Sequence, residues 1–276
     1  MTANLLGLQP TVRIERTDLT ILGLPIKVWD FGGQEQYRQE HLLRQQYFDR
    51  TNLLFYIVDI QDPERFQESF GYFLNILEII VELDLEPYIL VFFHKSDPEF
   101  KDSPELLKFC RDLEGLFNKL PQPFKITFHQ TSIFDYEPLT RIIVQAILKV
   151  LPKGAVIQDI LNNFMNKSES SAIMLLDENV LPIAEAYSTE KARDICRICG
   201  PHFATMVERL EKYQIDSPNV VEVEMKGWLF FKKIIYENTK FYLIFFTHAE
   251  KNFLKINSIL PIFTKDLFNV IRFVWD

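Results

Sequence analysis

Six residues from Trp29 to Gln34 combine the groups needed for phosphate and magnesium chemistry. They read Trp-Asp-Phe-Gly-Gly-Gln and begin at the last residue of the apolar run Ile26 to Trp29. Asp30 could hold Mg²⁺ through water, the amide of Gly33 could approach a phosphate, and Gln34 could orient an attacking water. Glycine is scarce, with 9 in the chain, so an adjacent pair needs a reason. A tight turn alone would also supply that reason, and this segment by itself leaves both interpretations open.

Two more polar segments follow apolar runs later in the chain. His94-Lys95-Ser96-Asp97 comes after Tyr88 to Phe93, and Thr131-Ser132-Ile133-Phe134-Asp135 comes shortly after Lys125 to Phe128. The Asp97 carboxylate could accept paired hydrogen bonds from a guanine edge while the Lys95 stem covers the ring. Each segment alone could be a polar strand end. Together with Trp29 to Gln34, they fall in the order of the nucleotide loops of a GTPase.

The elements that must position these residues form an α/β pattern in the first 152 residues. Four short apolar runs predict strands, at Ile26 to Trp29, Leu53 to Ile60, Tyr88 to Phe93 and Lys125 to Phe128. Helical spacing of apolar residues appears in Pro63 to Val81 and in Leu139 to Leu151. Strands that are apolar throughout are buried on both faces, which favours helices on both sides of a parallel sheet. We therefore predict a doubly wound, mostly parallel sheet.

The rest of the chain, residues 153–276, follows a different pattern. A helix over Ile157 to Met165 should precede two strands around Asp177-Glu178-Asn179 and a helix from about Thr189 to Tyr213. Val221, Val223 and Met225 alternate with Glu222, Glu224 and Lys226, which predicts a strand with one wet face. Strands over Leu229 to Tyr236 and Phe241 to Thr247, then a terminal helix, complete a smaller α+β domain. We place the boundary at Leu151-Pro152-Lys153-Gly154 because proline and glycine end the preceding helix.

Composition excludes several classes of function. The chain has 276 residues, of which 47% are hydrophobic and 25% charged, and a net charge of -8. This acidic balance argues against a nucleic-acid binder, since phosphate contacts need clustered Lys and Arg. No apolar run is long enough for a membrane span or fits a secretory leader, so we expect a cytoplasmic protein. Three cysteines argue against a disulfide framework.

Taken together, these motifs resemble those of the Rag and Gtr GTPases. The resemblance to Arf-like and Ras-like proteins is more distant. The resemblance rests on WDFGGQ, on HKSD and on TSIFD followed by a helix ending in Leu-Pro, and histidine at position 94 is itself a Rag-like trait. The segment Thr11 to Glu15 matches the family's first switch. The resemblance implies that GTP or GDP and Mg²⁺ are the ligands. By resemblance, the nucleotide-binding residues are Thr11, Asp30, Gly33, His94, Lys95, Asp97, Ser132 and Ile133; Thr11 and Asp30 serve Mg²⁺, and Gln34 is the catalytic candidate.

One part of the family pattern is absent from these residues. The phosphate-binding loop G-x-x-x-x-G-K-[ST] has no match, because no glycine here is followed by lysine. Without this loop, about five charge-assisted hydrogen bonds to the phosphates are missing, at roughly 1.5–3 kcal/mol each. The free energy of nucleotide binding would then be weaker by at most on the order of 7–15 kcal/mol, so tight GTP binding is not expected. The Ras-like sheet would also lack its first strand, leaving apolar edges at Ile26 to Trp29 and Leu53 to Ile60. Either the sequence is N-terminally incomplete, or it is a degenerate member kept as a scaffold.

The resemblance also sets expectations for function and partners. Residues 1–152 would be a Ras-like GTPase domain, and residues 153–276 a roadblock or longin-like dimerisation domain. We expect a GTP-binding signalling switch that forms a homodimer or heterodimer with a second Rag/Gtr-like subunit and is read by regulatory or adaptor proteins. Eukaryotic members act peripherally at the lysosome or vacuole through partners. The alternative is a nucleotide-free pseudo-GTPase scaffold.

Cys196-Arg197-Ile198-Cys199 is a further motif with two interpretations. A C-x-x-C pair is half of a zinc site, but no second pair exists in the sequence. Both thiols would lie on one face of the predicted helix, where cysteine packs as a small hydrophobe. We expect packing rather than metal or redox chemistry.

Overall fold

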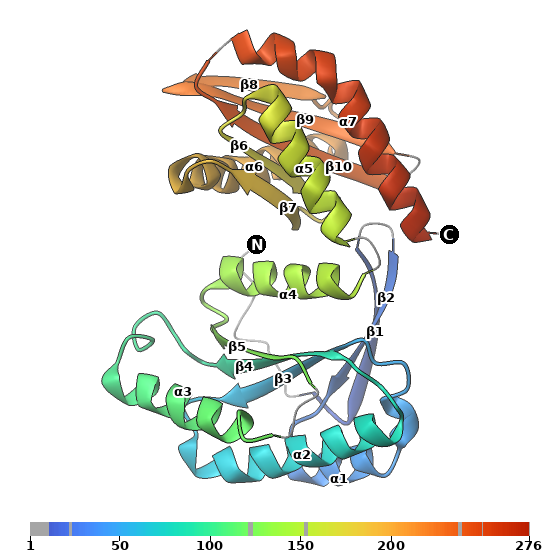
Figure 1. Cartoon of the computed structure of the whole chain (residues 1–276), viewed down its shortest axis with the longest axis vertical. Helices are drawn as coiled ribbons and strands as arrows, with labels where there is room; N and C mark the ends of the chain where they lie inside the picture. The colour runs from blue at the N-terminus through green and yellow to red at the C-terminus, as the bar shows by residue number, and fades with distance from the viewer. Residues whose placement is uncertain are drawn as a thin grey trace. The chain divides into compact units, whose positions relative to one another are not determined.

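The computed structural model describes residues 11–21, 24–120, 124–151, 154–236, 239–249 and 251–275. The chain divides into two compact units, one built mainly from residues up to 140 and the other mainly from residue 141 onward. Figure 1 shows both units. The predicted boundary falls on Pro152 and Lys153, which lie outside the described residues, so it stays a prediction.

The first unit contains two separate sheets. β1 (Ile14–Ile21) and β2 (Leu24–Phe31) form a two-stranded sheet, and β3 (Leu53–Asp59), β4 (Tyr88–His94) and β5 (Ile126–Thr131) form a three-stranded sheet in that order. Both strand pairs of the larger sheet are parallel. The predicted α/β class and parallel sheet are confirmed. The polar segments at the ends of β4 and β5 therefore meet at one rim of the sheet.

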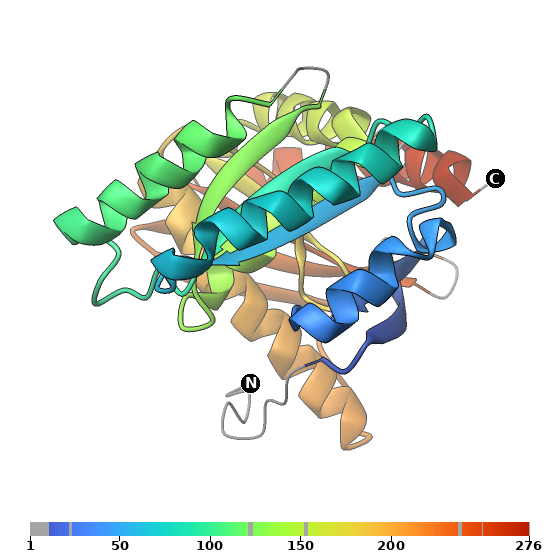
Figure 2. The ribbon, with the colours of Figure 1, turned by 90° about the horizontal axis from the view of Figure 1, so that it is seen from below.

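Two helices cover one face of the parallel sheet, α2 (Phe66–Glu82) and α3 (Pro104–Phe117) (Figure 2). Their core is aromatic: Phe73 lies 4.7 Å from Tyr56 and 4.9 Å from Phe117, measured between ring centroids. The phenylalanines of this unit are thus largely packing residues. The remaining elements before residue 151 are α1 (Glu35–Leu42), the 3-10 turns η2 (Gln45–Tyr47) and η3 (Pro63–Arg65), and α4 (Tyr136–Val150), whose residues from Arg141 onward count with the second unit.

Within the described residues, the two sheets of this unit remain separate. β2 and β3 are not paired with each other in the described part of the chain. Ile57 on β3 is 61% exposed, whereas Tyr56 and Val58, which face α2 and α3, are buried. Ile57 points to the opposite face of the sheet from Tyr56 and Val58, so that face is apolar and exposed at β3, which is an edge strand of the described sheet.

The second unit has the predicted order of helix, two strands, helix, three strands and helix. Its elements are α5 (Gly154–Ser168), β6 (Ala172–Leu176), β7 (Pro182–Tyr187), α6 (Glu190–Lys212), β8 (Val220–Met225), β9 (Gly227–Tyr236), β10 (Thr239–Thr247) and α7 (Lys251–Trp275). The strands form an antiparallel sheet in the order β7-β6-β10-β9-β8. The predicted α+β class is confirmed, and β8 is an edge strand.

Adjacent residues of β10 face opposite sides of this sheet, as the period of a strand requires. Phe246 packs in the core cluster that contains Cys196 and other α6 residues. Phe245 instead contacts the ring of Phe164 on α5, which in turn stacks near Phe263 on α7. Figure 1 shows α6 on one face and α5 with α7 on the other. Both faces are therefore covered within this unit.

Asp177 holds the turn between β6 and β7 and should make stability depend on pH. Its Oδ1 accepts hydrogen bonds from the amides of Asn179 (2.9 Å) and Leu181 (2.8 Å). Burial raises the pKa of this carboxyl to about 6, from 3.8. Because the folded pKa lies above the unfolded one, the free energy of unfolding should fall between about pH 4 and pH 6, by on the order of 2–3 kcal/mol.

The variant Asp177→Asn keeps one acceptor oxygen for the two amides and does not ionise. Urea unfolding of both proteins from pH 4 to pH 7 should show the variant gaining stability relative to the parent as pH rises. A stability difference that stays constant over this range would contradict the assignment.

Candidate functional site

The carboxylate of Asp97, just after β4, is oriented by Ser132, just after the neighbouring strand β5. The Ser132 hydroxyl donates to Asp97 Oδ1 at 2.5 Å, and it accepts from the amide of Phe134 at 3.1 Å. Ser132 is buried, so this geometry is protected from water. Among the described residues, Asp97 Oδ2 accepts no hydrogen bond. One carboxylate oxygen is therefore fixed by the protein while the other is available to a ligand.

His94 ties the ends of β4 and β5 together. Its Nδ1 lies 3.1 Å from Thr131 Oγ1, and its carbonyl accepts from the amide of Ile60, just after β3. The amide of Ser96 donates to the carbonyl of Thr131 at 3.0 Å. Burial lowers the pKa of His94 against the opposing effect of nearby acidic groups. A neutral histidine thus serves as a hydrogen-bonding brace at the rim.

Lys95 has an acidic partner that the sequence did not point to. Its ammonium donates to Asp59 Oδ2 at 2.6 Å, and Asp59 is the last residue of β3. The backbone of Lys95 is left-handed, with φ of 64°, and its carbonyl accepts from the Gln61 side chain at 2.9 Å. The ion pair is largely exposed, so it adds little stability but fixes the position of the lysine.

The second group of predicted residues forms a cluster of its own. The hydroxyl of Thr11 donates to Asp30 Oδ2 at 2.6 Å, and the amide of Gly32 donates to the carbonyl of Arg13 at 2.8 Å. A hydroxyl and a carboxylate are the oxygen ligands that Mg²⁺ takes, usually with several waters and phosphate oxygens. Thr11 and Asp30 therefore fit the metal that the resemblance implies.

This cluster is connected to the parallel sheet through Arg38. Arg38 Nε donates to the carbonyl of Gly33 at 2.7 Å, and its Nη1 contacts Glu68 Oε1 at 2.7 Å. Glu68 lies in the first turn of α2, which begins shortly after β3 ends. Gly33 is thus held on the side of the sheet where β3, β4 and β5 end.

Gln34 begins α1 and is exposed to solvent. It occupies the position before the first helical residue, with extended backbone, and its side-chain oxygen accepts from Gln36 Nε2 at 3.0 Å. Ile133 is 41% exposed beside the buried Ser132. Both lie in loops that a ligand could reach, and their roles stay predictions.

The two adjacent glycines have different requirements, and this predicts different effects of substitution. A Cβ on Gly32 would lie 2.5 Å from the carbonyl oxygen of Thr11, whereas a Cβ on Gly33 would contact nothing within 4 Å. Gly32→Ala should therefore displace the segment at Thr11 and lower the free energy of unfolding by about 1–3 kcal/mol. Gly33→Ala should leave it unchanged or raise it by about 0.4–1 kcal/mol.

Urea unfolding of the two variants tests this pair, and each serves as the control of the other. If the two variants lower the free energy of unfolding equally, the predicted crowding between a Cβ at position 32 and the carbonyl of Thr11 is contradicted. A loss of ligand binding in Gly33→Ala without a loss of stability would show that Gly33 is kept for the ligand.

The C-x-x-C motif packs as the sequence predicted. Cys196 is buried in the core of the second unit, and Cys199 packs against the same cluster. Burial raises the pKa of both thiols, which lowers the fraction of reactive thiolate. Within the residues described, no group of three or more His, Cys, Asp or Glu side chains is arranged to hold a metal ion.

Comparison with known proteins decides the family. The conserved region of Gtr1/RagA G proteins matches residues 1–209 of this chain. The chain belongs to this family. The GTP-binding protein gtr1 of Schizosaccharomyces pombe is 25% identical over 183 residues, covering 65% of this chain and 58% of that protein. The Ras-related GTP-binding protein A of Dictyostelium discoideum is 24% identical over 190 residues, covering 68% and 62%.

The chain thus spans about three fifths of the length of these Rag and Gtr relatives. ADP-ribosylation factor F of Dictyostelium discoideum is 33% identical over 110 residues, or 40% of this chain and 56% of that protein. Among solved structures, Myxococcus xanthus MglB matches with a TM-score of 0.35 and 13% identity, covering 44% of this chain and 92% of its own. Within the described ranges, no helix is long and apolar enough to cross a membrane.

Proposed function

We propose that this protein is a Rag/Gtr-like GTP-binding switch in which residues at the ends of β4 and β5 read the guanine base. The observation that carries the proposal is the Ser132 hydroxyl bond to Asp97. It leaves Asp97 Oδ2 for the ligand and holds the carboxylate in one orientation before binding. Adjacent N–H groups on guanine can pair with such a carboxylate, whereas adenine presents no equivalent pair. Lys95 and Ile133 would flank the base, and His94 braces the strand ends.

The cluster around Thr11 and Asp30 would sense the phosphates. Mg²⁺, when bound, would neutralise phosphate charge, and Thr11 with Asp30 would supply its protein oxygens. The Thr11 hydroxyl now donates to Asp30, so binding a metal requires this proton to turn away from the carboxylate. The amide of Gly33 would approach the terminal phosphate, and Gln34 would orient a water for hydrolysis. GTP and GDP would then differ in how they hold the loop from Asp30 to Gln34.

The phosphate-binding loop is the part of the family site that these residues do not contain. We propose that the gene encodes it upstream of Met1. Reading the genomic DNA before Met1 for an in-frame G-x-x-x-x-G-K-[ST] tests this proposal directly, and a nearby in-frame stop would contradict it. Titration of the 276-residue chain with fluorescent GDP should show binding weaker than micromolar, because the deficit estimated above removes most of the affinity.

The missing loop also favours a second candidate function, a pseudo-GTPase scaffold that binds protein partners. The exposed Ile57 side chain on the edge strand β3 is consistent with such a role, since a protein partner could cover it. An upstream stop codon together with no guanosine binding at millimolar concentration would favour the scaffold over the switch.

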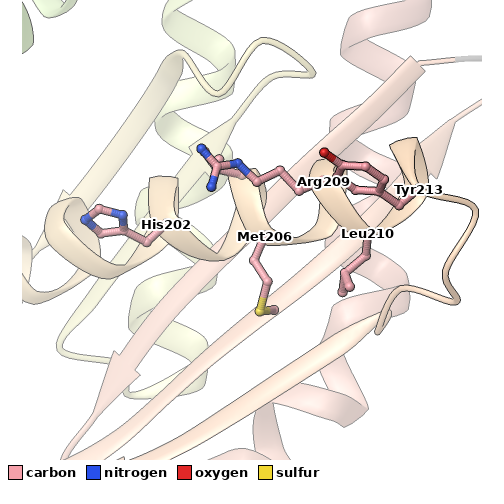
Figure 3. A pocket seen from close by; sticks show the side chains of 6 residues that line it. His202, Met206, Arg209, Leu210 and Tyr213 are labelled. Atoms are coloured by element: carbon pink, nitrogen blue, oxygen red, sulfur yellow. The ribbon is translucent and has the colours of Figure 1, made fainter. Parts of the chain in front are cut away.

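For dimerisation, we propose the surface formed by the β8 edge and the outer side of α6. β8 has a neighbour on one side only within the described sheet. Ile198 on α6 is 65% exposed, and Tyr213, directly after α6, is 74% exposed. Between them lies an open groove of about 350 Å³, lined by His202, Thr205, Met206, Arg209, Leu210 and Tyr213 (Figure 3). A second subunit could extend the sheet through β8 and cover this groove together with the exposed Ile198 and Tyr213 side chains.

Charge on β8 favours a heterodimer over a homodimer. Glu222 and Glu224 are exposed and point to the same face of the strand. Two-fold pairing of β8 with itself, centred on any residue from 222 to 224, would place a glutamate opposite a glutamate. Like charges directly opposite destabilise a strand pair. A different subunit with Lys or Arg at the facing positions would avoid this repulsion.

Light scattering after size exclusion tests this surface. The pair Met206→Glu and Tyr213→Glu should abolish association with a Rag/Gtr-like partner, while Ile262→Glu on α7, which is 60% exposed, should not. An equal loss of association in both variants would mean that binding depends on exposed apolar residues in general, and would contradict the proposed surface. A stable homodimer of the isolated chain at micromolar concentration would contradict the charge argument.

A further inference from the structure

Arg38 connects the loop at Gly33 to helix α2 through three contacts. Its guanidinium donates to the Gly33 carbonyl, pairs with Glu68 on α2, and lies 5.2 Å from the ring centroid of Tyr72 on the same helix. The Arg38 side chain is only 16% exposed, although Glu68 is 49% exposed. A half-exposed ion pair contributes little to global stability. The hydrogen bond to a loop carbonyl is therefore the contact with a specific consequence.

The carbonyl of Gly33 belongs to the peptide group that joins Gly33 to Gln34. Fixing this carbonyl fixes the plane of that peptide, because the peptide bond is rigid. The plane in turn sets the direction of the Gln34 amide and the starting point of its side chain. Arg38 therefore controls the orientation of Gln34 without touching a ligand.

A second connection from α2 reaches the other side of the same cluster. The Tyr72 hydroxyl lies 3.3 Å from His41 Nδ1, and His41 Nε2 lies 3.1 Å from the carbonyl of Arg13. That carbonyl also accepts from the amide of Gly32. His41 is buried, and burial lowers its pKa, which keeps the ring neutral and able to accept from Tyr72 while donating to Arg13. Two residues of α2, one helical turn apart, thus support the cluster around Thr11 and Asp30. Glu68 acts through Arg38 on Gly33, and Tyr72 acts through His41 on the carbonyl of Arg13.

We infer that Arg38 is a positioning residue that couples the loop from Asp30 to Gln34 to helix α2, and that it favours the loop conformation that binds a terminal phosphate. The inference rests on the proposed function. When the γ-phosphate accepts from Gly33, the loop must stay where Arg38 holds it. Binding of GTP should therefore strengthen the connection to α2, and loss of Arg38 should weaken GTP binding more than GDP binding.

Hydrogen–deuterium exchange of the unliganded chain tests the positioning role without any nucleotide. Arg38→Ala should speed exchange of amides 33 to 38 by about tenfold and leave β3 to β5 unchanged. Arg38→Lys should restore part of the protection, because a lysine can donate to the Gly33 carbonyl but cannot match the fork of the guanidinium. Arg44→Ala is the matched control, since Arg44 lies in the same segment, is 52% exposed and pairs with Glu40.

Glu68→Gln completes the test as a double-mutant cycle. It should give part of the Arg38→Ala effect, and the double variant should exchange no faster than Arg38→Ala alone. Unchanged exchange in Arg38→Ala, or an equal increase throughout the first unit, would overturn the inference. The first result would mean that Arg38 does not hold the loop, and the second that it supports the fold only.

Nucleotide-binding measurements on the same variants distinguish a failure of this inference from a failure of the proposed function. With GTP and GDP at up to millimolar concentration, Arg38→Ala should lower the ratio of GTP to GDP affinity about tenfold while GDP affinity changes less than twofold. Equal losses for both nucleotides would overturn the coupling to the terminal phosphate. If neither nucleotide binds the parent chain, the guanine site proposed for this chain is contradicted, and the exchange experiment still decides whether Arg38 positions the loop.

Discussion

Replacing Asp97 with asparagine is expected to lower affinity for guanosine nucleotides by about 100-fold or more. The carboxylate would accept two charge-assisted hydrogen bonds from guanine, one at Oδ2 and one at the second lone pair of Oδ1, each worth roughly 1.5–3 kcal/mol. Asparagine keeps one acceptor oxygen but presents an amide donor where guanine also presents a donor. The same change should improve binding of xanthosine nucleotides, because xanthine carries an acceptor oxygen in place of the guanine amino group. Competition between the two nucleotides, followed by NMR, measures both effects.

The matched control is Asp102→Asn, an exposed aspartate that follows Asp97 in the same loop region. It should leave both affinities unchanged. Ser132→Ala should lower guanosine affinity by a smaller factor, since it frees the carboxylate to rotate without removing it. If Asp97→Asn weakens guanosine and xanthosine nucleotides equally, Asp97 supports the loop and does not read the base.

Replacing Glu211 with alanine is expected to destabilise the second unit by about 3–5 kcal/mol. Its carboxylate accepts from Lys233 at 2.8 Å, Lys240 at 2.5 Å and Ser217 at 3.0 Å. The Lys233 side chain is only 8% exposed, so its ammonium would remain buried without a counter-charge. Removing one partner of such a pair costs far more than the pair itself contributes. Thermal and urea unfolding of the variant measure the loss.

The double variant Glu211→Ala with Lys233→Met provides the decisive comparison. It should be more stable than Glu211→Ala alone, because methionine removes the uncompensated charge while filling similar space. If Glu211→Ala costs less than about 1 kcal/mol, the network is incidental.

The same network should produce an acid transition. Hydrogen bonds from Lys233 and Lys240 lower the pKa of Glu211 to about 2, from 4.5. The folded pKa lies below the unfolded one, so this stability is present above about pH 4.5 and is lost as pH falls towards 2. Asp177 acts in the opposite direction between pH 4 and pH 6, and single variants of the two residues separate their contributions.

Much of the fold was predictable because apolar runs and helical spacing are local signals. Each predicted strand of the first unit was found, and the alternating pattern of Val220 to Lys226 gave the edge strand β8. Two helices were missed. α3 carried a usable signal in Ser103, whose hydroxyl caps the helix before Pro104. α1 carried almost none, since His41 is its only residue that the structure buries.

The candidate site was predictable only where its residues lie close along the sequence or follow strands. Thr11 meets Asp30, and Ser132 meets Asp97, as the order of the motifs implied. Arg38 and Glu68 are thirty residues apart and belong to no motif, so their contact emerges only when α2 packs beside α1. The distinct roles of Gly32 and Gly33 were also hidden, because the crowding at Gly32 comes from the carbonyl of Thr11.

NMR titration of the unaltered chain with guanosine and adenosine diphosphates, each at millimolar concentration with Mg²⁺, tests the central claim most directly. We expect weak, saturable shifts for GDP at the amides of Lys95 to Asp97 and of Ser132 and Ile133, and none there for ADP. Equal responses to the two nucleotides, or no response at these amides, would contradict a guanine site at this rim.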